Sequence, residues 1–112
     1  MTLEEKVMHL TKETLVDLVN LRYDKLKEEN KINDENEEFL KEVFQMQGTL
    51  TLPPSDEEMD INVYKYNDNS GFSTEVYLWF DGVESPIILF CEAKTNAEKT
   101  EITEFYIETV DV

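Results

Sequence analysis

Few side chains in this sequence are of the types that carry out catalysis or hold a metal. His9 is the only histidine, and no cysteine or second histidine stands beside it at the spacing of a metal site. Cys91, the only cysteine, belongs to an apolar row of a predicted strand, so we expect a buried thiol rather than a nucleophile. The acidic turns at 56–58 and 68–69 do not match the spacing of a calcium-binding loop. We therefore expect a protein that is not an enzyme and has no metal and no cofactor.

The C-terminal half of the sequence favours a protein-binding role, because aromatic residues alternate with acidic residues along its predicted strands. Aromatic residues are enriched at protein interfaces, since they supply a large contact area with few rotatable bonds. Carboxylates between them would pair with Arg or Lys of a partner. We expect these side chains to share a sheet face that binds a partner, with self-association or internal packing as alternatives. The predicted binding residues are Glu75, Tyr77, Trp79, Ile88, Phe90, Glu92, Glu104, Tyr106 and Glu108.

The net charge favours a basic protein as that partner. The chain has 26 acidic and 10 basic residues, a formal charge of −16, and residues 49–112 hold 14 of the acids but only 3 of the bases. Such a field repels nucleic acid and anionic membranes and accelerates encounter with a basic protein. Acidity that serves only solubility is the alternative. Neither a basic patch nor a phosphate-binding glycine loop occurs in the sequence.

Two helices are predicted to precede the strands that carry these residues. Thr2 and Glu5 form a capping-box pattern, and apolar residues follow at spacings of three and four. Since neither Gly nor Pro occurs before Gly48, this pattern predicts one long helix over about 3–29. A second capping signal and the stop at Gly48 predict another helix over about 35–47.

The rest of the chain is predicted to form antiparallel strands joined by tight turns. Leu50 and Leu52 indicate a brief extended segment, which Pro53-Pro54 ends. Alternating residues and turn signals then predict four strands, with Pro86 at the start of the third, where its missing N–H costs least. The predicted strands span residues 60–66, 72–81, 86–94 and 100–110.

These elements predict a single α+β domain over residues 1–112, with two N-terminal helices packed on a four-stranded antiparallel meander. The helices are expected to cover the sheet face that carries the apolar rows. Those rows are Phe72, Val76, Leu78 and Phe80 on one strand and Ile87, Leu89 and Cys91 on the next. On the last strand, strict alternation assigns Phe105 and Ile107 to one face and Ile102, Glu104, Tyr106, Glu108 and Val110 to the other.

The sequence also predicts a cytoplasmic location. No apolar run approaches the ~20 residues that a membrane span needs, and the N-terminus lacks the basic and apolar regions of a signal peptide. The single Cys91 cannot form an intramolecular disulfide, which fits a reducing compartment.

From about Asp34 onward the sequence resembles a family of small uncharacterised bacterial α+β domains. The motifs that carry the resemblance are the second helix running into GTLTLPP, the acidic turn DEE, the strand EVYLWF and the closing strand FYIETVDV. The layout is also similar to the cystatin-like and NTF-two-like cone folds, in which helices pack on a curved sheet and which serve binding, dimerisation and catalysis alike. The overall profile, small, strongly acidic and aromatic-rich, is similar to that of bacterial immunity proteins that neutralise basic nuclease toxins.

The function that these observations favour is an immunity-type inhibitor that binds and neutralises a basic protein toxin, such as a nuclease domain. Acidic side chains would steer the encounter and aromatic side chains would anchor the complex. Two alternatives stay open. One is a cone-shaped domain whose cavity, of roughly 300 Å³ or more, binds a small molecule or performs simple acid–base chemistry. The other is a structural module that forms a homodimer through the sheet face.

Overall fold

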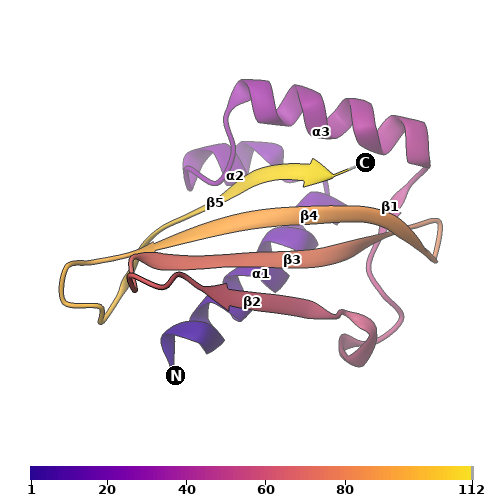
Figure 1. Cartoon of the computed structure of the whole chain (residues 1–112). Helices are drawn as coiled ribbons and strands as arrows, with labels where there is room; N and C mark the ends of the chain where they lie inside the picture. Colours follow the sequence, from indigo (N-terminus) through magenta and orange to yellow (C-terminus); the bar gives the residue numbers. More distant parts are fainter. Residues whose placement is uncertain (112) are drawn as a thin grey trace.

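The computed structural model describes residues 1–111, and its helices pack on one side of an antiparallel sheet (Figure 1). The helices are α1 Leu3–Val19, α2 Tyr23–Glu28 and α3 Asp34–Gln47, with a single 3-10 turn, η1, at Asp56–Glu58. The strands are β1 Leu50–Thr51, β2 Ile61–Lys65, β3 Gly71–Phe80, β4 Val83–Thr95 and β5 Ile102–Asp111. Among the described residues, no helix is apolar over enough of its length to cross a membrane.

The single helix predicted over 3–29 is wrong, because the chain turns between α1 and α2. Leu21 adopts the left-handed conformation, with a φ of 59°, and the N–H of Arg22 donates to the carbonyl of Asp17 at 2.9 Å. This is the hydrogen-bond pattern of a Schellman C-cap, a position that usually holds glycine. The turn brings α2 back beside α1, where Asp17 pairs with Arg22 and Lys25. Contacts across a turn leave no periodic signal in the sequence.

The other helix predictions are confirmed. The N–H of Glu5 donates to the Thr2 hydroxyl at 3.1 Å, and the N–H of Thr2 donates to the Glu5 carboxylate at 3.2 Å, which is the predicted capping box. The helix predicted over 35–47 is α3, which begins one residue earlier. Gly48 follows it with a φ of 129°, and a Cβ there would collide with the Asp81 carboxylate. Both the backbone angle and the close approach therefore require glycine.

The sheet has five antiparallel strands where four were predicted. β3 pairs along one edge with β1 and β2 and along the other with β4, which in turn pairs with β5. The predicted order β2-β3-β4-β5 is present, and the brief segment at Leu50 is an extra strand opposite Phe80. This strand is held by Asp81, whose N–H donates to the Thr49 carbonyl at 2.8 Å and whose carboxylate accepts from the Thr49 N–H at 3.2 Å.

The position predicted for Pro86, at the start of a strand, is wrong. β4 begins at Val83, so Pro86 lies inside the strand, where the register between β3 and β4 shifts opposite Leu78. A proline in such an irregular stretch interrupts no regular ladder of hydrogen bonds. The hydroxyl of Ser85 donates to the Leu78 carbonyl at 2.6 Å and accepts from the Ile87 N–H at 3.2 Å.

Two further register shifts overturn part of the face assignment for β5. Cys91 of β4 pairs with Ile107 of β5, and the preceding Phe90 pairs with Thr109. At this point β5 therefore has one residue more than β4, namely Glu108. The extra residue moves Val110 to the helix-covered face, where it is 4% exposed, although strict alternation assigned it to the opposite face. Ile102, opposite Thr95, likewise packs against the core after a second shift.

The apolar rows predicted to face the helices are confirmed as the floor of the core. Each of their residues is at most 5% exposed, and they form one hydrophobic cluster with the inward side chains of α1, α2 and α3. Burial of this apolar area is the main stabilising contribution to the fold. In Figure 1 all three helices lie on the far side of the sheet, and no helix of residues 1–111 covers the near side.

Candidate functional site

The sheet face that no helix covers, hereafter the outer face, brings together the side chains predicted to bind a partner. Cross-strand pairing sets Glu75 opposite Phe90 and Glu92 opposite Tyr106, so each of these carboxylates has an aromatic ring beside it. Glu108 occupies the bulge of β5. The outer face includes Asn62, Tyr64, Tyr66, Ser73, Glu75, Tyr77, Trp79, Glu84, Ile88, Phe90, Glu92, Lys94, Glu104, Tyr106, Glu108, Thr109 and Asp111.

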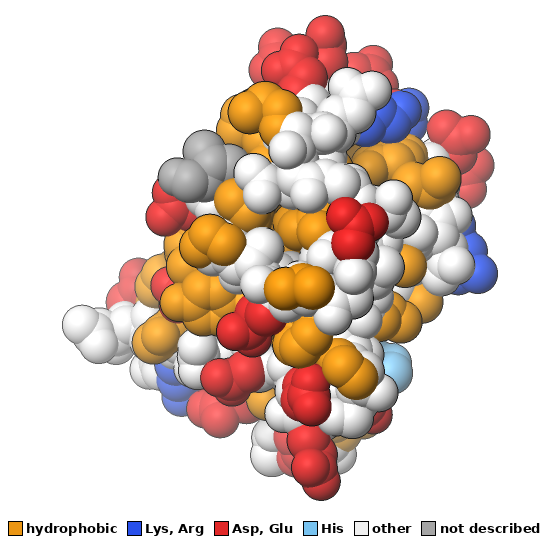
Figure 2. Space-filling model, turned by 90° about the vertical axis from the view of Figure 1, so that its right-hand side faces the viewer, with side chains coloured by type: hydrophobic (Ala, Val, Ile, Leu, Met, Phe, Trp, Pro, Cys, Tyr) orange, Lys and Arg blue, Asp and Glu red, His pale blue; other side chains and the backbone are white. Residues whose placement is uncertain are grey.

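The large apolar side chains of the outer face are only partly covered. Trp79, Ile88, Phe90 and Tyr106 are intermediate between buried and exposed, and Tyr77 is 41% exposed. Figure 2 looks at the end of the molecule that lies on the right in Figure 1, and hydrophobic side chains gather beside acidic ones in its left-hand part, the side of the outer face. Contiguous patches of exposed apolar side chains are a feature of protein interaction sites.

Two tyrosines absent from the predicted set, Tyr64 and Tyr66, extend the outer face across β2. The Tyr64 hydroxyl donates to the Glu75 carboxylate at 3.4 Å, and the Tyr66 hydroxyl donates a short hydrogen bond to the Glu92 carboxylate. Both rings stay open to solvent, at 50% and 39% exposed. Their alternation with apolar residues of the same strand is the sequence signal that could have identified them, because residues two apart in a strand share a face.

Glu92 lies beside a like charge, the Glu108 carboxylate. Burial raises the pKa of the Glu92 carboxyl above its ordinary value and neighbouring Glu108 adds to the rise, while the hydrogen bond from Tyr66 opposes it. Burial, together with that hydrogen bond, raises the pKa of Tyr66 to about 12, so its hydroxyl remains a donor at neutral pH. Two neighbouring carboxylates at a partly desolvated position repel each other, and a cation from a partner would relieve that repulsion.

Lys94 is the one basic side chain among the outer-face residues. Its Nζ lies 3.7 Å from Oε2 of Glu104 and 6.0 Å from the centroid of the Tyr106 ring. Both members of the ion pair are more than half exposed, so water screens it and it contributes little to stability. Glu75, Glu92 and Glu108 form no ion pair within residues 1–111, which leaves these carboxylates available to a partner.

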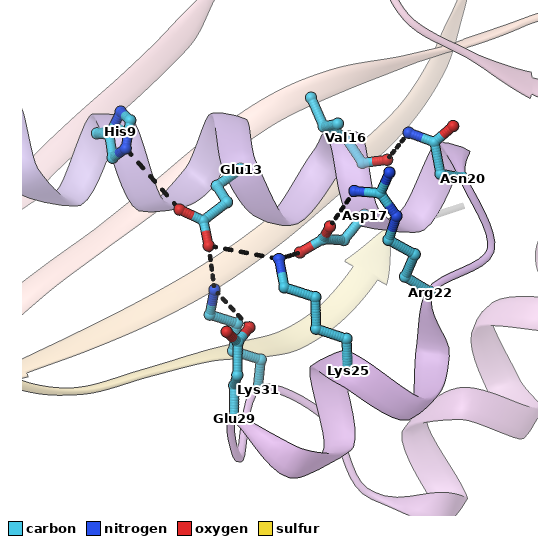
Figure 3. Close-up of polar contacts among 9 residues, drawn as sticks. All are labelled: His9, Glu13, Val16, Asp17, Asn20, Arg22, Lys25, Glu29 and Lys31. Carbon is cyan, nitrogen blue, oxygen red and sulfur yellow. Dashed lines mark hydrogen bonds and ion pairs between the residues drawn. The ribbon is translucent and has the colours of Figure 1, made fainter.

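The helices differ from the outer face, because a cluster of their charged side chains is paired internally (Figure 3). The Asp17 carboxylate is 1% exposed and accepts hydrogen bonds from Lys25 at 2.8 Å and from Arg22 at 3.1 Å. Burial raises the pKa of Asp17, but the hydrogen bonds from Lys25 and Arg22 outweigh burial and lower it overall. These contacts join α1 to α2.

Three carboxylates of this helical cluster lie close enough together to be tested as a metal site. Ligand atoms of Glu13, Asp17 and Glu29 are all within 4.8 Å of one another. Lys25 Nζ lies 3.7 Å from Glu13, however, and Lys31 Nζ lies 3.2 Å from Glu29 and 3.5 Å from Glu13 (Figure 3). These ammonium groups supply the positive charge that a metal would bring, and a metal would have to displace them. The cluster therefore fits a structural role, joining α1 to α2, better than a metal centre. It is called the helical clamp hereafter and consists of Glu13, Asp17, Arg22, Lys25, Glu29 and Lys31.

His9 and Cys91, the only residues of their types, lie in different surroundings. The His9 side chain is well exposed on α1, and its Nε2 lies 3.8 Å from the Glu13 carboxylate. The buried thiol predicted for Cys91 is confirmed, and burial raises the pKa of Cys91 to about 12. A thiol in that environment stays protonated at neutral pH and is a poor nucleophile.

Two open grooves border the helices, away from the outer face. One, of about 490 Å³, lies between the start of α1 and the β2–β3 hairpin, with Leu3 and Phe72 in its lining. The other, of about 520 Å³, lies between α1, α3 and β1, with Leu18 and Phe44 in its lining. Both are open to solvent, whereas small-molecule sites enclose most of the ligand surface.

A family model matches most of the chain. The family described as "Domain of unknown function (DUF7668)" matches residues 15–112. The match is longer than the resemblance seen in the sequence from Asp34 onward, because it adds the C-terminal end of α1, from Leu15, and all of α2. It therefore includes Asp17 and every residue of the outer face. No curated protein and no solved structure matches the chain.

Proposed function

The chain belongs to this family of domains of unknown function, and we propose that it binds a basic protein partner through the outer face. In its more specific form the proposal is an immunity-type inhibitor that neutralises a basic bacterial toxin, such as a nuclease domain. One observation supports it above the others. A sheet face without a helix combines partly exposed aromatic rings with carboxylates, Glu75, Glu92 and Glu108, that have no ion pair within residues 1–111.

The aromatic side chains supply the anchoring part of the proposed interface. Trp79 and Tyr77 neighbour each other along one side of β3, and Tyr77 is opposite Ile88 on β4. Binding energy at protein interfaces concentrates in such Trp and Tyr side chains when a partner excludes water from them. Removing Trp79 should therefore weaken binding more than removing any single carboxylate at the rim.

The carboxylates supply the steering part. Charges at the edge of an interface mainly raise the association rate, and this effect falls as salt screens the field. A row of carboxylates also resembles, in charge, the phosphates that a nuclease binds, so an acidic face suits the basic groove of a nuclease.

Self-association through the outer face has less support. In a two-fold symmetric dimer the same patch meets its own copy, so Glu75 and Glu92 of one chain would approach the acidic residues of the other. Lys94 alone cannot neutralise them. Sedimentation velocity at low salt should show a monomer, and a stable dimer that dissociates in Trp79→Ala would overturn this reasoning.

The test of the proposed function is association with the product of the neighbouring gene, because a toxin and its inhibitor must be inherited together to protect the cell. We expect binding whose association rate falls at least tenfold between about 0.05 M and about 0.5 M salt. We also expect co-expression to restore growth of cells that produce the neighbouring protein. A neighbouring product that is harmless and is not bound would overturn the proposal.

Two matched triple variants locate the binding face. The first variant removes three charges from the outer face by combining Glu75→Gln, Glu92→Gln and Glu104→Gln. We expect it to weaken binding at least about tenfold, mostly by lowering the association rate. Glu28→Gln, Glu38→Gln and Glu42→Gln remove three charges from exposed positions on the helices. If the helical variant loses as much affinity as the outer-face variant, the partner binds elsewhere.

A further inference from the structure

We propose that the outer face selects arginine over lysine side chains on its partner. This inference rests on the proposed function and names the chemistry of the same site. The geometry that carries it is the pairing of a carboxylate with tyrosine rings at two places on the face. Tyr64 donates to Glu75, and Tyr66 donates to Glu92.

Each tyrosine holds its carboxylate in place while leaving it able to accept further hydrogen bonds. An ionised carboxylate has about four lone-pair positions, and the tyrosine hydroxyl uses one of them. Holding the carboxylate in advance reduces the entropy lost when a partner binds. At the second place the Tyr106 side chain lies opposite Glu92 on neighbouring β5, so this carboxylate has the ring of Tyr106 beside it as well as the hydroxyl of Tyr66, which follows β2.

The chain itself shows that this face holds a cation in such surroundings. Lys94 places its Nζ near both the Glu104 carboxylate and the Tyr106 ring. The 6.0 Å to the ring centroid is the outer limit of a cation–π contact. Lysine can approach a ring and a carboxylate only as a point charge.

Arginine makes better use of the same surroundings. Its guanidinium is planar, so it can lie flat against a tyrosine ring while its edge donates two parallel hydrogen bonds to a carboxylate. It is also more weakly hydrated than an ammonium, so it loses less when a protein face covers it. The neighbouring Glu108 carboxylate adds negative charge beside Glu92, which favours a delocalised cation that can contact both.

The test compares two peptides by calorimetry at low salt. One alternates arginine with serine over about ten residues, and the other replaces every arginine with lysine. We expect the arginine peptide to bind at least about fivefold more tightly. Trp79, the only tryptophan, lies on the outer face and gives a fluorescence signal for binding there.

Two variants separate ring stacking from charge alone. In the double variant Tyr64→Leu, Tyr66→Leu the preference for the arginine peptide should fall to about onefold, because the arginine peptide loses more affinity than the lysine peptide. Both side chains are exposed, and far-UV circular dichroism checks the fold. Phe39→Leu, which removes an exposed aromatic ring from α3, should keep the preference.

Equal affinity of the wild-type chain for the two peptides would overturn arginine selection, as would an unchanged preference in the tyrosine variant. Failure of both peptides to bind would overturn it too. The measurement with the neighbouring gene product uses neither peptide, so it decides the proposed function separately.

Discussion

The helical layer and the outer face are both rich in acidic residues, but they use them differently. Within residues 1–111, every ion pair but one joins side chains of residues 9–41, and the exception is Lys94–Glu104 on the outer face. The basic residues follow the same division, because 7 of the 10 lie in the first 48 residues. Half of the 12 acidic residues among the first 48 are therefore paired with a cation within residues 1–111, whereas on the outer face only Glu104 is.

This difference teaches what a net charge of −16 can and cannot indicate. The total alone does not say which carboxylates are available to a partner. The ion pairs do, because a carboxylate that already has an internal cation gains less from a second one. The ion-paired acidic residues of the helices thus contribute to folding, and the unpaired carboxylates of the outer face contribute mainly to the surface potential.

The largest expected effect on stability is that of Asp17→Asn, which removes the buried charge of the helical clamp. The variant loses two charge-assisted hydrogen bonds, but Lys25 and Arg22 are exposed enough for water to hydrate them afterwards. We expect the free energy of unfolding to fall by about 2–3 kcal/mol in urea denaturation. Glu28→Gln, at an exposed position on α2, should change it by less than about 0.5 kcal/mol.

Affinity for the partner is the second readout of this variant. Asp17 lies on the helix side of the sheet, so Asp17→Asn should leave binding unchanged as long as the protein is folded. A variant that kept its stability but lost binding would mean that the helical clamp, and not the outer face, is the functional site.

The strands of the sheet could be predicted because their apolar and polar side chains alternate with a period of two along the sequence. The row from Phe72 to Phe80 and the turn at Asp81-Gly82 follow from local chemistry, and both residues of that turn have positive φ. The outer face follows from the same alternation, but the register shifts in β5 move Val110 to the opposite face. A one-residue bulge depends on neighbouring strands and has no reliable local signal.

The helical clamp could not be predicted, because its members are brought together by tertiary packing. Asp17 pairs with Arg22 and Lys25, which are five and eight residues away and lie beyond a turn. A spacing of eight would put two residues on one face of an unbroken helix, but too far apart to touch. Only the left-handed Leu21, which reverses the chain, lets them meet, and leucine gives no indication of that conformation.

A smaller effect, on the pH dependence of stability, has opposite sign in the two regions. Glu92 has a raised pKa, so the folded chain binds its proton first and the free energy of unfolding increases as the pH falls towards its ordinary value of 4.5. Asp17 has a lowered pKa, so its contribution is complete above its ordinary value of 3.8 and is lost as the pH falls through the folded value. We expect Glu92→Gln to abolish a gain of less than about 1 kcal/mol between about pH 7 and about pH 5.

Thermal unfolding of the wild type and Glu92→Gln between about pH 7 and about pH 5 measures the first effect. Extending the series below pH 3.8 for the wild type and Asp17→Asn measures the second. Glu104→Gln removes the same charge from the same face and serves as the control for net charge. An identical gain in the wild type and in Glu92→Gln would show that folding does not raise the pKa of Glu92.

The smallest expected effect compares two shielded polar groups, one in each region. Among the described residues, neither the Trp79 Nε1 nor the Thr14 hydroxyl has a hydrogen-bond partner, although both are shielded from solvent. Trp79→Phe removes the unpaired donor but also some apolar area, so the free energy of unfolding should change by less than about 0.5 kcal/mol. Thr14→Val keeps the shape of the side chain and removes only the hydroxyl, so it should stabilise by up to about 1 kcal/mol.

The two variants differ little in their expected free energy of unfolding, but they should differ clearly in their affinity for the partner. Trp79→Phe should weaken association with the partner several-fold, because it shortens an aromatic anchor on the outer face. Thr14→Val should leave association unchanged, because Thr14 is fully buried on α1 beneath the other side of the sheet. If Trp79→Phe destabilised the free protein by more than about 1.5 kcal/mol, its Nε1 would have an acceptor in solution. The Trp79 N–H on the outer face would then be hydrogen-bonded without a partner. Only the difference in ion pairing would still distinguish the outer face from the helices.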